Sequence, residues 1–436
     1  MPEDLAITLS PECLDEGARE ERASFGLLTI RAGGQNLTEG FDSWLNGYRL
    51  GPLVSGYHAA EWFAWNWWRL RWEPQSSSPN WWRAHKMVSI GEGYIWPNLT
   101  IFSDGLRTAL ISHPSSRPDA KPFRYVGANP CILPSSKFEA AIDAFIPQVL
   151  GRLRDSGIPE TNLDRVWRDV LAERSDPDAA LRRRFEALLG ADPDDSDVGT
   201  IEQLVRDADD LGKNSISELA ADHRPGGAVT GADTIRQIAH SAGFDTSRDI
   251  PRLAPGTIPS VRADVPAWLL GARVAQALRE QLDLGSSPIS NTALAELAGV
   301  SAGALAGDVR GSDLSFVLDE GKSGCRMVLR SKWRTGRRFE LARLLGDRLM
   351  NPAHEKLFPA TRSHTFRQKA QRSFAAEFLA PFEEINARLD GDYSEENRQD
   401  VAESFEVSEL TIHTLLVNHH RLARDDLDEA LEVSVA

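Results

Sequence analysis

Tryptophans concentrate in one short part of this sequence. Nine of the twelve lie between Trp44 and Trp96, in runs such as HAAEWFAWNWWRLRWEP and NWWRAHKM. Rings of this size must be largely removed from water, so the segment needs a core of its own. Gly, Pro, Ser and Asn separate these runs, and β-branched or aromatic residues fill LLTIRA, MVSIG and NLTIFS, which predicts short strands with tight turns. The run YHAAEWFAWNWWRLRW is predicted to be a helix, because its tryptophans recur near helical spacing.

Two interpretations of the tryptophan-rich segment remain open. In the favoured one the rings form a small aromatic core, with Arg69 and Arg71 lying over ring faces as cation–π partners. The expected members of that core are Trp62, Trp65, Trp67, Trp68, Trp72 and Trp96. In the other, the side chains form a binding surface, because tryptophan and arginine together stack on bases or anchor a protein partner. The candidate surface residues are Trp62, Trp65, Trp68, Arg69, Arg71 and Trp72.

The sequence predicts an α+β multidomain fold with four consecutive parts. Residues 1–135 are expected to form the tryptophan-rich, β-containing binding domain. Residues 136–224 carry apolar side chains at helical spacing, as in SKFEAAIDAFIPQVLGRLRDSG, and are expected to be helical. Residues 225–262 are rich in Gly and Pro and are expected to be a linker. Residues 263–436 are expected to form an α+β module that ends in helices.

Charge and composition restrict the classes of function. The chain of 436 residues has a formal net charge of −15, which argues against attraction of nucleic acid to its whole surface but allows a local basic patch. Its start, MPEDLAITLS, does not resemble a signal peptide, and no apolar stretch is long enough to span a bilayer, so no membrane partner is expected. The three cysteines lack C-x-x-C spacing, which predicts a cytoplasmic protein without disulfides and without a cysteine-built zinc site.

One segment of the C-terminal part, GRRFELARLLGDRLM, has the length and apolar rhythm of a helix that carries an H-E-x-x-H zinc site. Before it, LSFVL and RMVLR predict two strands separated by a glycine-containing turn. After it come QKAQRSFAAEFLAP and VAESFEVS, in that order. Together these segments resemble the ImmA/IrrE family of bacterial metallopeptidase-like proteins, over roughly residues 266–422. The resemblance implies a zincin-like α+β module.

The resemblance also implies that the catalytic motif is degenerate. H-E-x-x-H chemistry needs two imidazoles one helical turn apart and a glutamate that deprotonates a zinc-bound water. The family's two histidines are matched by Arg343 and Asp347, its glutamate by Leu344, and its third ligand, on the next helix, by Gln368. A guanidinium cannot bind a cation, and leucine cannot move a proton. The mapping therefore implies a pseudo-peptidase with no catalytic residue, no metal and no cofactor.

These substitutions lead to a structural expectation. Arg343 and Asp347 are four residues apart, so they can form an ion pair on one helix face. Alternatively, Arg343 is expected to reach a carboxylate of the next helix, such as Glu377. Gln368 would complete a hydrogen-bonded polar plug in the space that zinc and its ligands fill in the family.

Three other features leave alternatives open. His354, His364 and Glu377 could form a displaced metal site, although loop histidines are more often surface residues. The segments NTALAELAGVSAGAL and DVAESFEVSELTIHTLL have the rhythm of helix-turn-helix units, but their second helices lack the basic residues that DNA binding needs. The strongest basic run, RSKWRTGRR, could face phosphates or be the solvated start of the following helix. Its candidate binding residues are Arg330, Lys332, Arg334, Arg337 and Arg338.

Three functions follow from these observations. The favoured one is a non-catalytic interaction or regulatory protein whose partner is a repressor, a toxin or a defence effector. The resemblance implies a role in bacterial stress response, toxin–antitoxin regulation or phage defence. The second is a zinc metallopeptidase that uses displaced ligands to cleave such a partner. The third is a nucleic-acid-binding regulator that uses the helix-turn-helix-like segments or the basic run.

Overall fold

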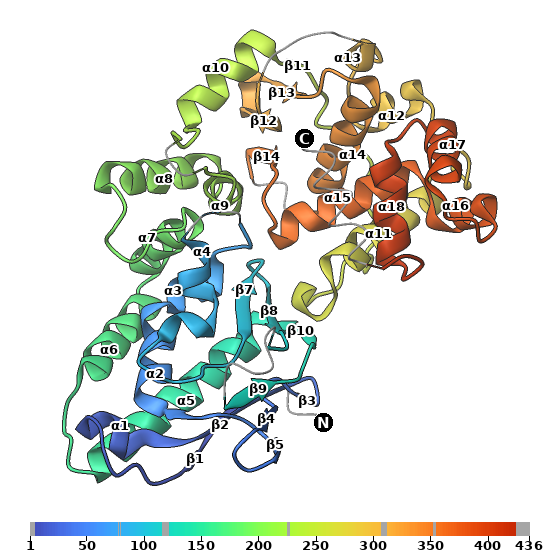
Figure 1. Cartoon of the computed structure of the whole chain (residues 1–436). Coiled ribbons are helices and arrows are strands. Elements are labelled where there is room, and N and C mark those ends of the chain that lie inside the picture. Colours follow the sequence, from blue (N-terminus) through green and yellow to red (C-terminus); the bar gives the residue numbers. More distant parts are fainter. Residues whose placement is uncertain are drawn as a thin grey trace. The chain divides into compact units, whose positions relative to one another are not determined.

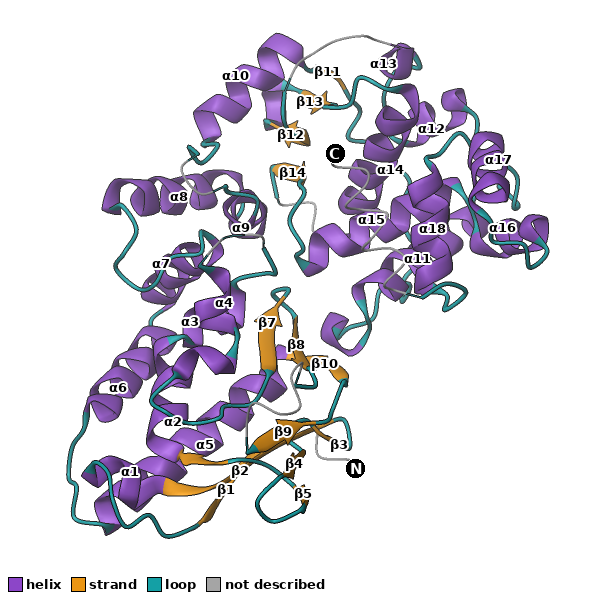
Figure 2. Ribbon diagram, in the orientation of Figure 1, coloured by secondary structure: helices purple, strands orange, loops and turns teal. Residues whose placement is uncertain are grey.

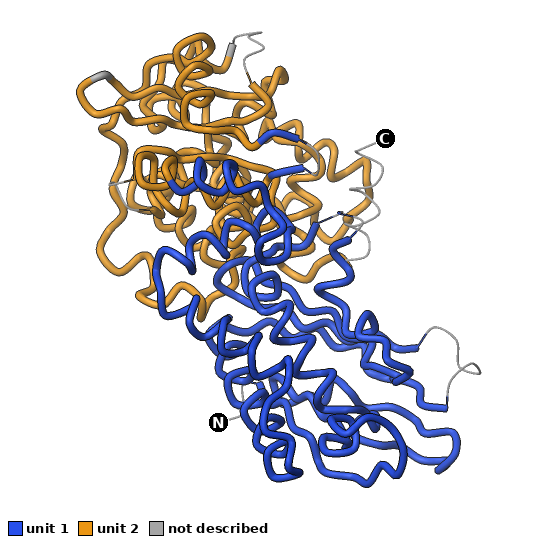
Figure 3. The backbone as a smooth tube through the Cα atoms, turned by 90° about the vertical axis from the view of Figure 1, so that its left-hand side faces the viewer, with its two compact units in different colours: residues 1–205, 223–228 blue, residues 206–222, 229–436 orange. Residues whose placement is uncertain are grey.

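The chain folds into two compact units, coloured separately in Figure 3. The computed structural model describes residues 5–76, 78, 80–115, 122–224, 227–306, 312–351 and 355–423. Unit 1 contains residues 1–205 and 223–228, and unit 2 contains residues 206–222 and 229–436. No helix in the described part of the chain combines the length and the apolar composition needed to cross a membrane.

Unit 1 combines three small antiparallel sheets with helices (Figure 1). Its strands are β1 (Leu5–Pro11), β2 (Phe25–Ala32), β3 (Gln35–Asn36), β4 (Gly40–Asp42), β5 (Gly47–Arg49), β6 (Leu53–Ser55), β7 (Leu99–Ser103), β8 (Arg107–Ser112), β9 (Phe123–Tyr125) and β10 (Pro130–Pro134). Its helices are α1 (Arg19–Ser24), α2 (Gly56–Trp65), α3 (Trp67–Trp72), α4 (Trp81–His85), α5 (Ser135–Asp155), α6 (Asn162–Ser175) and α7 (Pro177–Leu188). The sheet orders are β1-β2-β3 with β6 beside β2, β10-β8-β7, and β5-β4-β9.

The predicted strand MVSIG is wrong. Residues Met87–Ile90 form a short 3-10 helix instead. The hydroxyl of Ser89 donates to the carbonyl of Arg83 at 2.6 Å and accepts from the indole of Trp62 at 3.2 Å. These side-chain bonds compete with strand pairing and hold the segment against the core, where Met87 is fully buried. The predictions for LLTIRA and NLTIFS are confirmed by β2 and β7.

The tryptophan-rich segment forms a core, as the favoured interpretation predicts. Trp62, Trp67, Trp68 and Trp96 are at most 8% exposed and belong to one apolar cluster. Trp65 is the exception, at 52% exposed. The predicted helix exists but is interrupted at Asn66, which separates α2 from α3.

The two arginines of α3 have different roles. The guanidinium carbon of Arg71 lies 3.9 Å from the ring centroid of Trp72, so this cation–π prediction is confirmed. Arg184 approaches the same ring at 4.2 Å. Arg69 is buried and donates instead to the carboxylate of Glu73 at 2.7 Å, so its predicted place over a ring is wrong. A buried cation is stabilised more by a carboxylate four residues along the helix than by an aromatic ring.

Unit 2 consists mostly of helices around one antiparallel sheet (Figure 2). Its strands, in sheet order, are β11 (Phe244–Asp245), β13 (Cys325–Val328), β12 (Ser315–Asp319) and β14 (Leu357–Ala360). Its helices are α9 (Lys213–Ala221), α10 (Ala232–Ala242), α11 (Ala267–Gln281), α12 (Asn291–Leu297), α13 (Gly303–Ala306), α14 (Arg334–Met350), α15 (Phe366–Leu379), α16 (Phe382–Leu389), α17 (Glu395–Phe405) and α18 (Glu409–Asn418). The predicted hairpin is present, with Phe316 opposite Val328.

The units divide the chain at other places than the expected domain boundaries. Helices α5 to α7 lie in unit 1, whereas α9 lies in unit 2, and α8 (Val198–Leu211) runs from one unit into the other. The segment expected to be a linker, 225–262, contains α10 and β11. Strand β11 extends the sheet of unit 2 by pairing with β13, with Phe244 opposite Met327.

Helix α15 packs closely against both α11 and α14. Glycines make this possible at two places where no side chain would fit. A Cβ on Gly271 of α11 would lie 2.3 Å from the carbonyl oxygen of Ala370, and one on Gly346 of α14 would lie 2.4 Å from the ring of Phe374. The faces that α14 and α15 turn toward each other are thus held at a short separation, which positions the site described below.

We predict that Gly346→Ala lowers the free energy of unfolding by about 1 to 3 kcal/mol, because its methyl group would overlap the Phe374 ring. The matched control is Gly151→Ala in the interior of α5, where the new Cβ would meet no atom within 4 Å. That change should be neutral or stabilise by up to about 1 kcal/mol. Urea denaturation followed by circular dichroism measures both. A Gly346→Ala protein as stable as the parent would contradict the close approach of α14 and α15.

Candidate functional site

The positions that the resemblance assigns to a zinc site come from two neighbouring helices. Helix α14 carries Arg343, Leu344 and Asp347, and the first turn of α15 carries Gln368. Thr365 caps α15, since its hydroxyl accepts from the backbone N–H of Gln368 at 3.3 Å and so fixes the direction of that first turn. All four positions are buried, with Arg343 the most exposed at 5%.

Through one nitrogen, Arg343 joins α14 both to α15 and to the residue that follows strand β14. Its Nη2 donates to the carbonyl of Thr361 at 2.7 Å, to Oε1 of Gln368 at 2.6 Å and to Oε1 of Gln371 at 3.3 Å. The amide nitrogens of both glutamines donate in turn to the carbonyl of Pro359 in β14, each at 3.0 Å. The predicted polar plug therefore exists, but it is built of one guanidinium and neutral acceptors.

Asp347 pairs with a cation that the sequence analysis did not consider. Arg367 donates from Nε to Oδ1 at 2.8 Å and from Nη2 to Oδ2 at 2.7 Å, a bidentate arrangement in which Asp347 is fully buried. Nη1 of Arg367 also donates to Glu355 at 2.9 Å. The predicted Arg343–Asp347 ion pair is wrong. Arg367 wins because it approaches from the facing helix, where its planar group can meet both carboxylate oxygens at once.

The predicted contact between Arg343 and Glu377 is also wrong. Glu377 lies toward the end of α15 and accepts from Gln276 at 2.9 Å and from the backbone N–H of Phe382 at 3.3 Å. From Gln368 to Glu377 the helix rises by about 14 Å, which is beyond the reach of an arginine bonded at Gln368.

Arg367 lies among three carboxylates. Burial alone would lower its pKa, but Asp347, Glu218 and Glu355 outweigh burial and raise the pKa of Arg367 above its ordinary value. Glu218, on α9, accepts from the hydroxyl of Thr365 at 2.6 Å, and burial raises its pKa. Helix α9 is thereby linked to the start of α15 through polar contacts.

The donor atoms at these four positions do not fit a zinc ion. Both oxygens of Asp347 accept from Arg367, and Oε1 of Gln368 accepts from Arg343, so their lone pairs face guanidinium groups. Leu344 is fully buried in the apolar core. Across the described ranges, no three His, Cys, Asp or Glu side chains are arranged to hold a metal ion.

The three residues considered for a displaced metal site are not brought together where they are described. His354 lies outside the described residues. His364 is exposed just before α15, whereas Glu377 is buried near the end of that helix. The helix between them is about 16 Å long, so one ion cannot contact both.

Two arginines of the basic run have structural roles. Nε of Arg337 donates to the carbonyl of Ala304 at 2.9 Å, and Nη2 of Arg338 donates to the carbonyl of Ile289 at 2.8 Å. Arg338 also binds the side chain of Asn291, the first residue of α12. Both arginines are almost completely buried. They attach the α12–α13 pair to α14 and are unable to form a surface for a partner.

The other three cations of the run lie nearer to solvent. Arg330 donates from Nε to the buried Glu340 at 3.2 Å. Arg334 is exposed and pairs with Glu406 at 3.0 Å, and Lys332 is exposed. In this run, therefore, Arg337 and Arg338 have structural roles, whereas Arg330, Lys332 and Arg334 lie near enough to solvent to meet a ligand.

The helix-turn-helix-like segments are helix pairs whose second members face the protein interior or are very short. Helix α13 has four residues. Helix α18 contains no lysine or arginine, and Ile412, His413, Leu415 and Leu416 of this helix are buried. A recognition helix must present its side chains to a groove, so this burial favours the structural interpretation.

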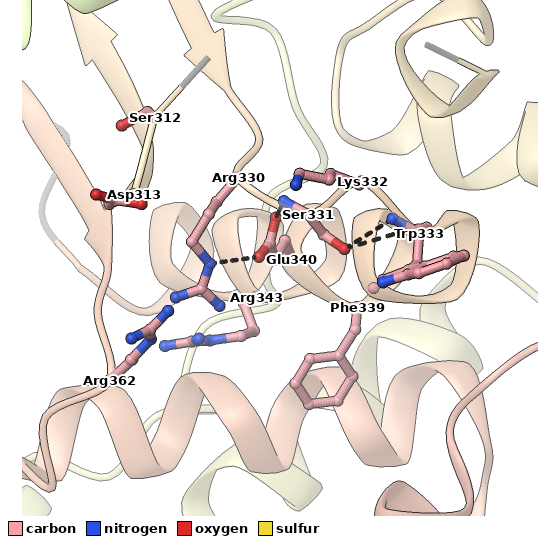
Figure 4. Close-up of a pocket in the computed structure, with 11 residues that line it drawn as sticks. Ser312, Asp313, Arg330, Ser331, Lys332, Trp333, Phe339, Glu340, Arg343 and Arg362 are labelled. Atoms are coloured by element: carbon pink, nitrogen blue, oxygen red, sulfur yellow. Dashed lines mark hydrogen bonds and ion pairs between the residues drawn. The ribbon is translucent and has the colours of Figure 1, made fainter. Parts of the chain in front are cut away.

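A cleft of about 780 Å³ opens beside the start of α14 (Figure 4). The residues that line it are Ser312, Asp313, Arg330, Ser331, Lys332, Trp333, Gly336, Phe339, Glu340, Arg343 and Arg362. Figure 4 shows the side chains of Arg330, Arg343 and Arg362 pointing toward one another, with the rings of Trp333 and Phe339 further along. Arg343 thus belongs both to the buried plug and to the wall of the cleft.

Sequence reasoning missed four residues of this region. Arg367 carried a usable signal: a cation in the first turn of a helix opposes the helix dipole and needs a partner. Trp333 stands between cations in the basic run, and a tryptophan in such surroundings is typical of a stacking surface. Gln371 and Arg362 carried no signal, because their importance depends on which residues the fold brings beside them.

We predict that Arg367→Met lowers the free energy of unfolding by about 3 to 5 kcal/mol, because it leaves the buried carboxylate of Asp347 without a cation. The double variant Arg367→Met with Asp347→Leu should recover most of that loss. The control is Arg168→Met, whose ion pair with Glu160 is 67% and 59% exposed and should contribute at most about 0.5 kcal/mol. If Arg367→Met proved no more harmful than Arg168→Met in chemical denaturation, Asp347 would not depend on this pair.

Glu377 provides a prediction about pH. Burial raises its pKa above the ordinary 4.5, and His419 lies 4.0 Å from its Oε2. A raised carboxyl pKa means that the folded state binds the proton more tightly, so its contribution to stability is full below pH 4.5 and is lost as pH rises through the folded pKa. Glu377→Gln keeps an acceptor for Gln276 and Phe382 and cannot ionise.

We expect Glu377→Gln to raise the unfolding free energy at pH 7 by on the order of 1 kcal/mol and to make no difference near pH 4. Thermal unfolding of both proteins across this pH range is the measurement. A gain of the same size at both pH values would mean that ionisation of Glu377 is not its cause.

No family model matches the sequence, and neither a curated protein nor a solved structure is significantly similar to the chain. The fold stands as a mixed α/β arrangement with several small antiparallel sheets.

Proposed function

We propose that this protein is a non-catalytic interaction protein built on a degenerate ImmA/IrrE-like module. One observation supports this most directly: Nη2 of Arg343 lies 2.6 Å from Oε1 of Gln368. In the family these two positions hold ligands of the same zinc ion, so they must meet across two helices. Here they also meet, but as a hydrogen-bond donor and an acceptor. The proposal explains both why the positions are adjacent and why their chemistry has changed.

The chemistry of the substituted site supports binding over catalysis. A guanidinium supplies a fixed positive charge, but it has no open coordination position and cannot lower the pKa of a water molecule as zinc does. Leu344 replaces the general base with an apolar side chain that packs in the core. A module of this kind retains its shape and its surfaces, and its function is then to hold a partner.

The partner that the resemblance suggests is another protein, namely a repressor, a toxin or a defence effector. The processes it suggests are bacterial stress response, toxin–antitoxin regulation or phage defence. The three cysteines are free, and Cys13 is exposed, which suits the reducing conditions of the cytoplasm.

Metal analysis tests the proposal. We predict that the purified protein holds no stoichiometric zinc, whereas Arg343→His/Leu344→Glu/Asp347→His/Gln368→Glu gains zinc affinity. Arg367 also pairs with Glu355, at 2.9 Å in the unmodified protein, so loss of Asp347 does not remove its only carboxylate partner. The matched control carries Asn in place of the two new histidines and should not gain zinc.

The outcomes separate the two leading functions. About one zinc per chain in the unmodified protein, lost on removal of His364 or Glu377, would instead support the metallopeptidase with displaced ligands. Circular dichroism of each variant verifies that the helices are intact before metal is measured.

A further inference from the structure

The cleft beside the start of α14 gathers positive charge on an acidic chain. Its cationic lining residues are Arg330, Lys332, Arg343 and Arg362, and they face two carboxylates. The whole chain, in contrast, has a net charge of −15. The first turn of α14 adds to the positive potential, because it has no acidic residue and no side chain caps its amide groups.

The arginines of the cleft keep donors for a ligand. Arg330 uses Nε for Glu340, and Arg343 uses Nη2 for the plug. Nε of Arg343 is buried and has no hydrogen-bond partner among the described residues. The backbone N–H of Arg362 donates to Asp222, so this bond does not use the guanidinium group. The guanidinium is exposed and points toward the cleft (Figure 4). Three guanidinium groups that point toward one another can together donate to one anion that has several acceptor oxygens.

The electrostatic environment of Arg343 also favours an anion in the cleft. Burial, together with the positive charges of Arg372 and Arg330, lowers the pKa of Arg343 to about 9, although Glu340 and Asp347 act in the opposite direction. A phosphate group carries negative charge and several acceptor oxygens, so it would offset this repulsion.

Next to these charges lies an exposed aromatic ring. Trp333 is 78% exposed, and Phe339 lines the same cleft (Figure 4). The backbone at Trp333 is held in place, since its N–H donates to the hydroxyl of Ser331 at 3.2 Å and the N–H of Ser331 donates to Glu340 at 2.9 Å. An exposed indole on a fixed backbone beside arginines is the arrangement on which nucleic-acid bases stack.

We propose that this cleft binds a nucleotide unit, either free or within a short single strand of nucleic acid, with a phosphate between Arg330, Arg343 and Arg362 and a base on Trp333. The site uses neither of the helix-turn-helix-like segments. It shares Arg343 with the substituted site but uses no protein partner, so it goes beyond the proposed function.

Fluorescence anisotropy tests the proposal with a labelled single-stranded oligonucleotide of about 10 nucleotides, as RNA and as DNA, at about 50 mM salt. Trp333→Ala should weaken binding about tenfold through lost stacking. Arg362→Ala should weaken it several-fold and reduce the dependence of affinity on salt by about one ion. Both side chains are exposed, so neither change should disturb the fold.

Two variants serve as matched controls. Arg273→Ala removes an exposed arginine of α11 that does not line the cleft, and Trp44→Ala removes an indole that is 86% exposed in unit 1. Neither should change the affinity. Competition by adenosine monophosphate and by inorganic phosphate then distinguishes a free nucleotide from a strand as the ligand.

Each outcome either supports or overturns the proposed nucleotide site. Binding that falls in Trp333→Ala and Arg362→Ala but not in the controls supports the site, and the competition shows whether a single nucleotide suffices. Absence of binding by oligonucleotide and nucleotide alike overturns the proposal. Binding of inorganic phosphate alone, unaffected by Trp333→Ala, also overturns it, because the ring would then have no part in recognition.

Discussion

The pairing of α14 with α15 depends on two buried guanidinium groups, one from each helix. Arg343 reaches from α14 into neutral acceptors of α15, and Arg367 reaches from α15 to the carboxylate of Asp347 on α14. Buried cations are costly unless every donor has a partner. Arg367 is neutralised by carboxylates, whereas Nη2 of Arg343 is solvated by amide and carbonyl oxygens and its Nε has no partner among the described residues. Gly346 then allows the helices to approach closely enough for both sets of bonds to form.

Much of the local structure follows from the sequence, for physical reasons. Apolar periodicity predicts α5 and α14 because a helix must cover one face of a core. Short apolar runs on either side of a glycine-containing turn predict β12 and β13, which pair as a hairpin. One exception, Met87–Ile90, shows the limit of such patterns, because the bonds of Ser89 to Arg83 and Trp62 override a weak strand preference.

The candidate site was predicted in part. The sequence mapping named Arg343 and Gln368 as members of one site, and the two side chains are hydrogen-bonded at 2.6 Å. It did not yield the partner of Asp347. An ion pair between residues four apart on a helix contributes little stability when it is exposed. Which charged groups pair in the interior depends instead on which helices pack against each other. That packing depends on the crossing of α14 and α15, which no single segment of sequence specifies.

A guanidinium and a zinc ion share a positive charge, but they differ in what they do with it. A zinc ion polarises a water molecule, exchanges ligands and can be removed by a chelator. Arg343, in contrast, is part of the chain and holds its acceptors through directional hydrogen bonds. Under the proposed function, a site in which the side chain replaces the ion keeps a positive charge and loses the reactive centre. Because Arg343 also lines the cleft, the charge that stabilises the helix pair is available to an anion on the other side. Arg343 thus contributes both to the packing of the helices and to the electrostatics of the cleft.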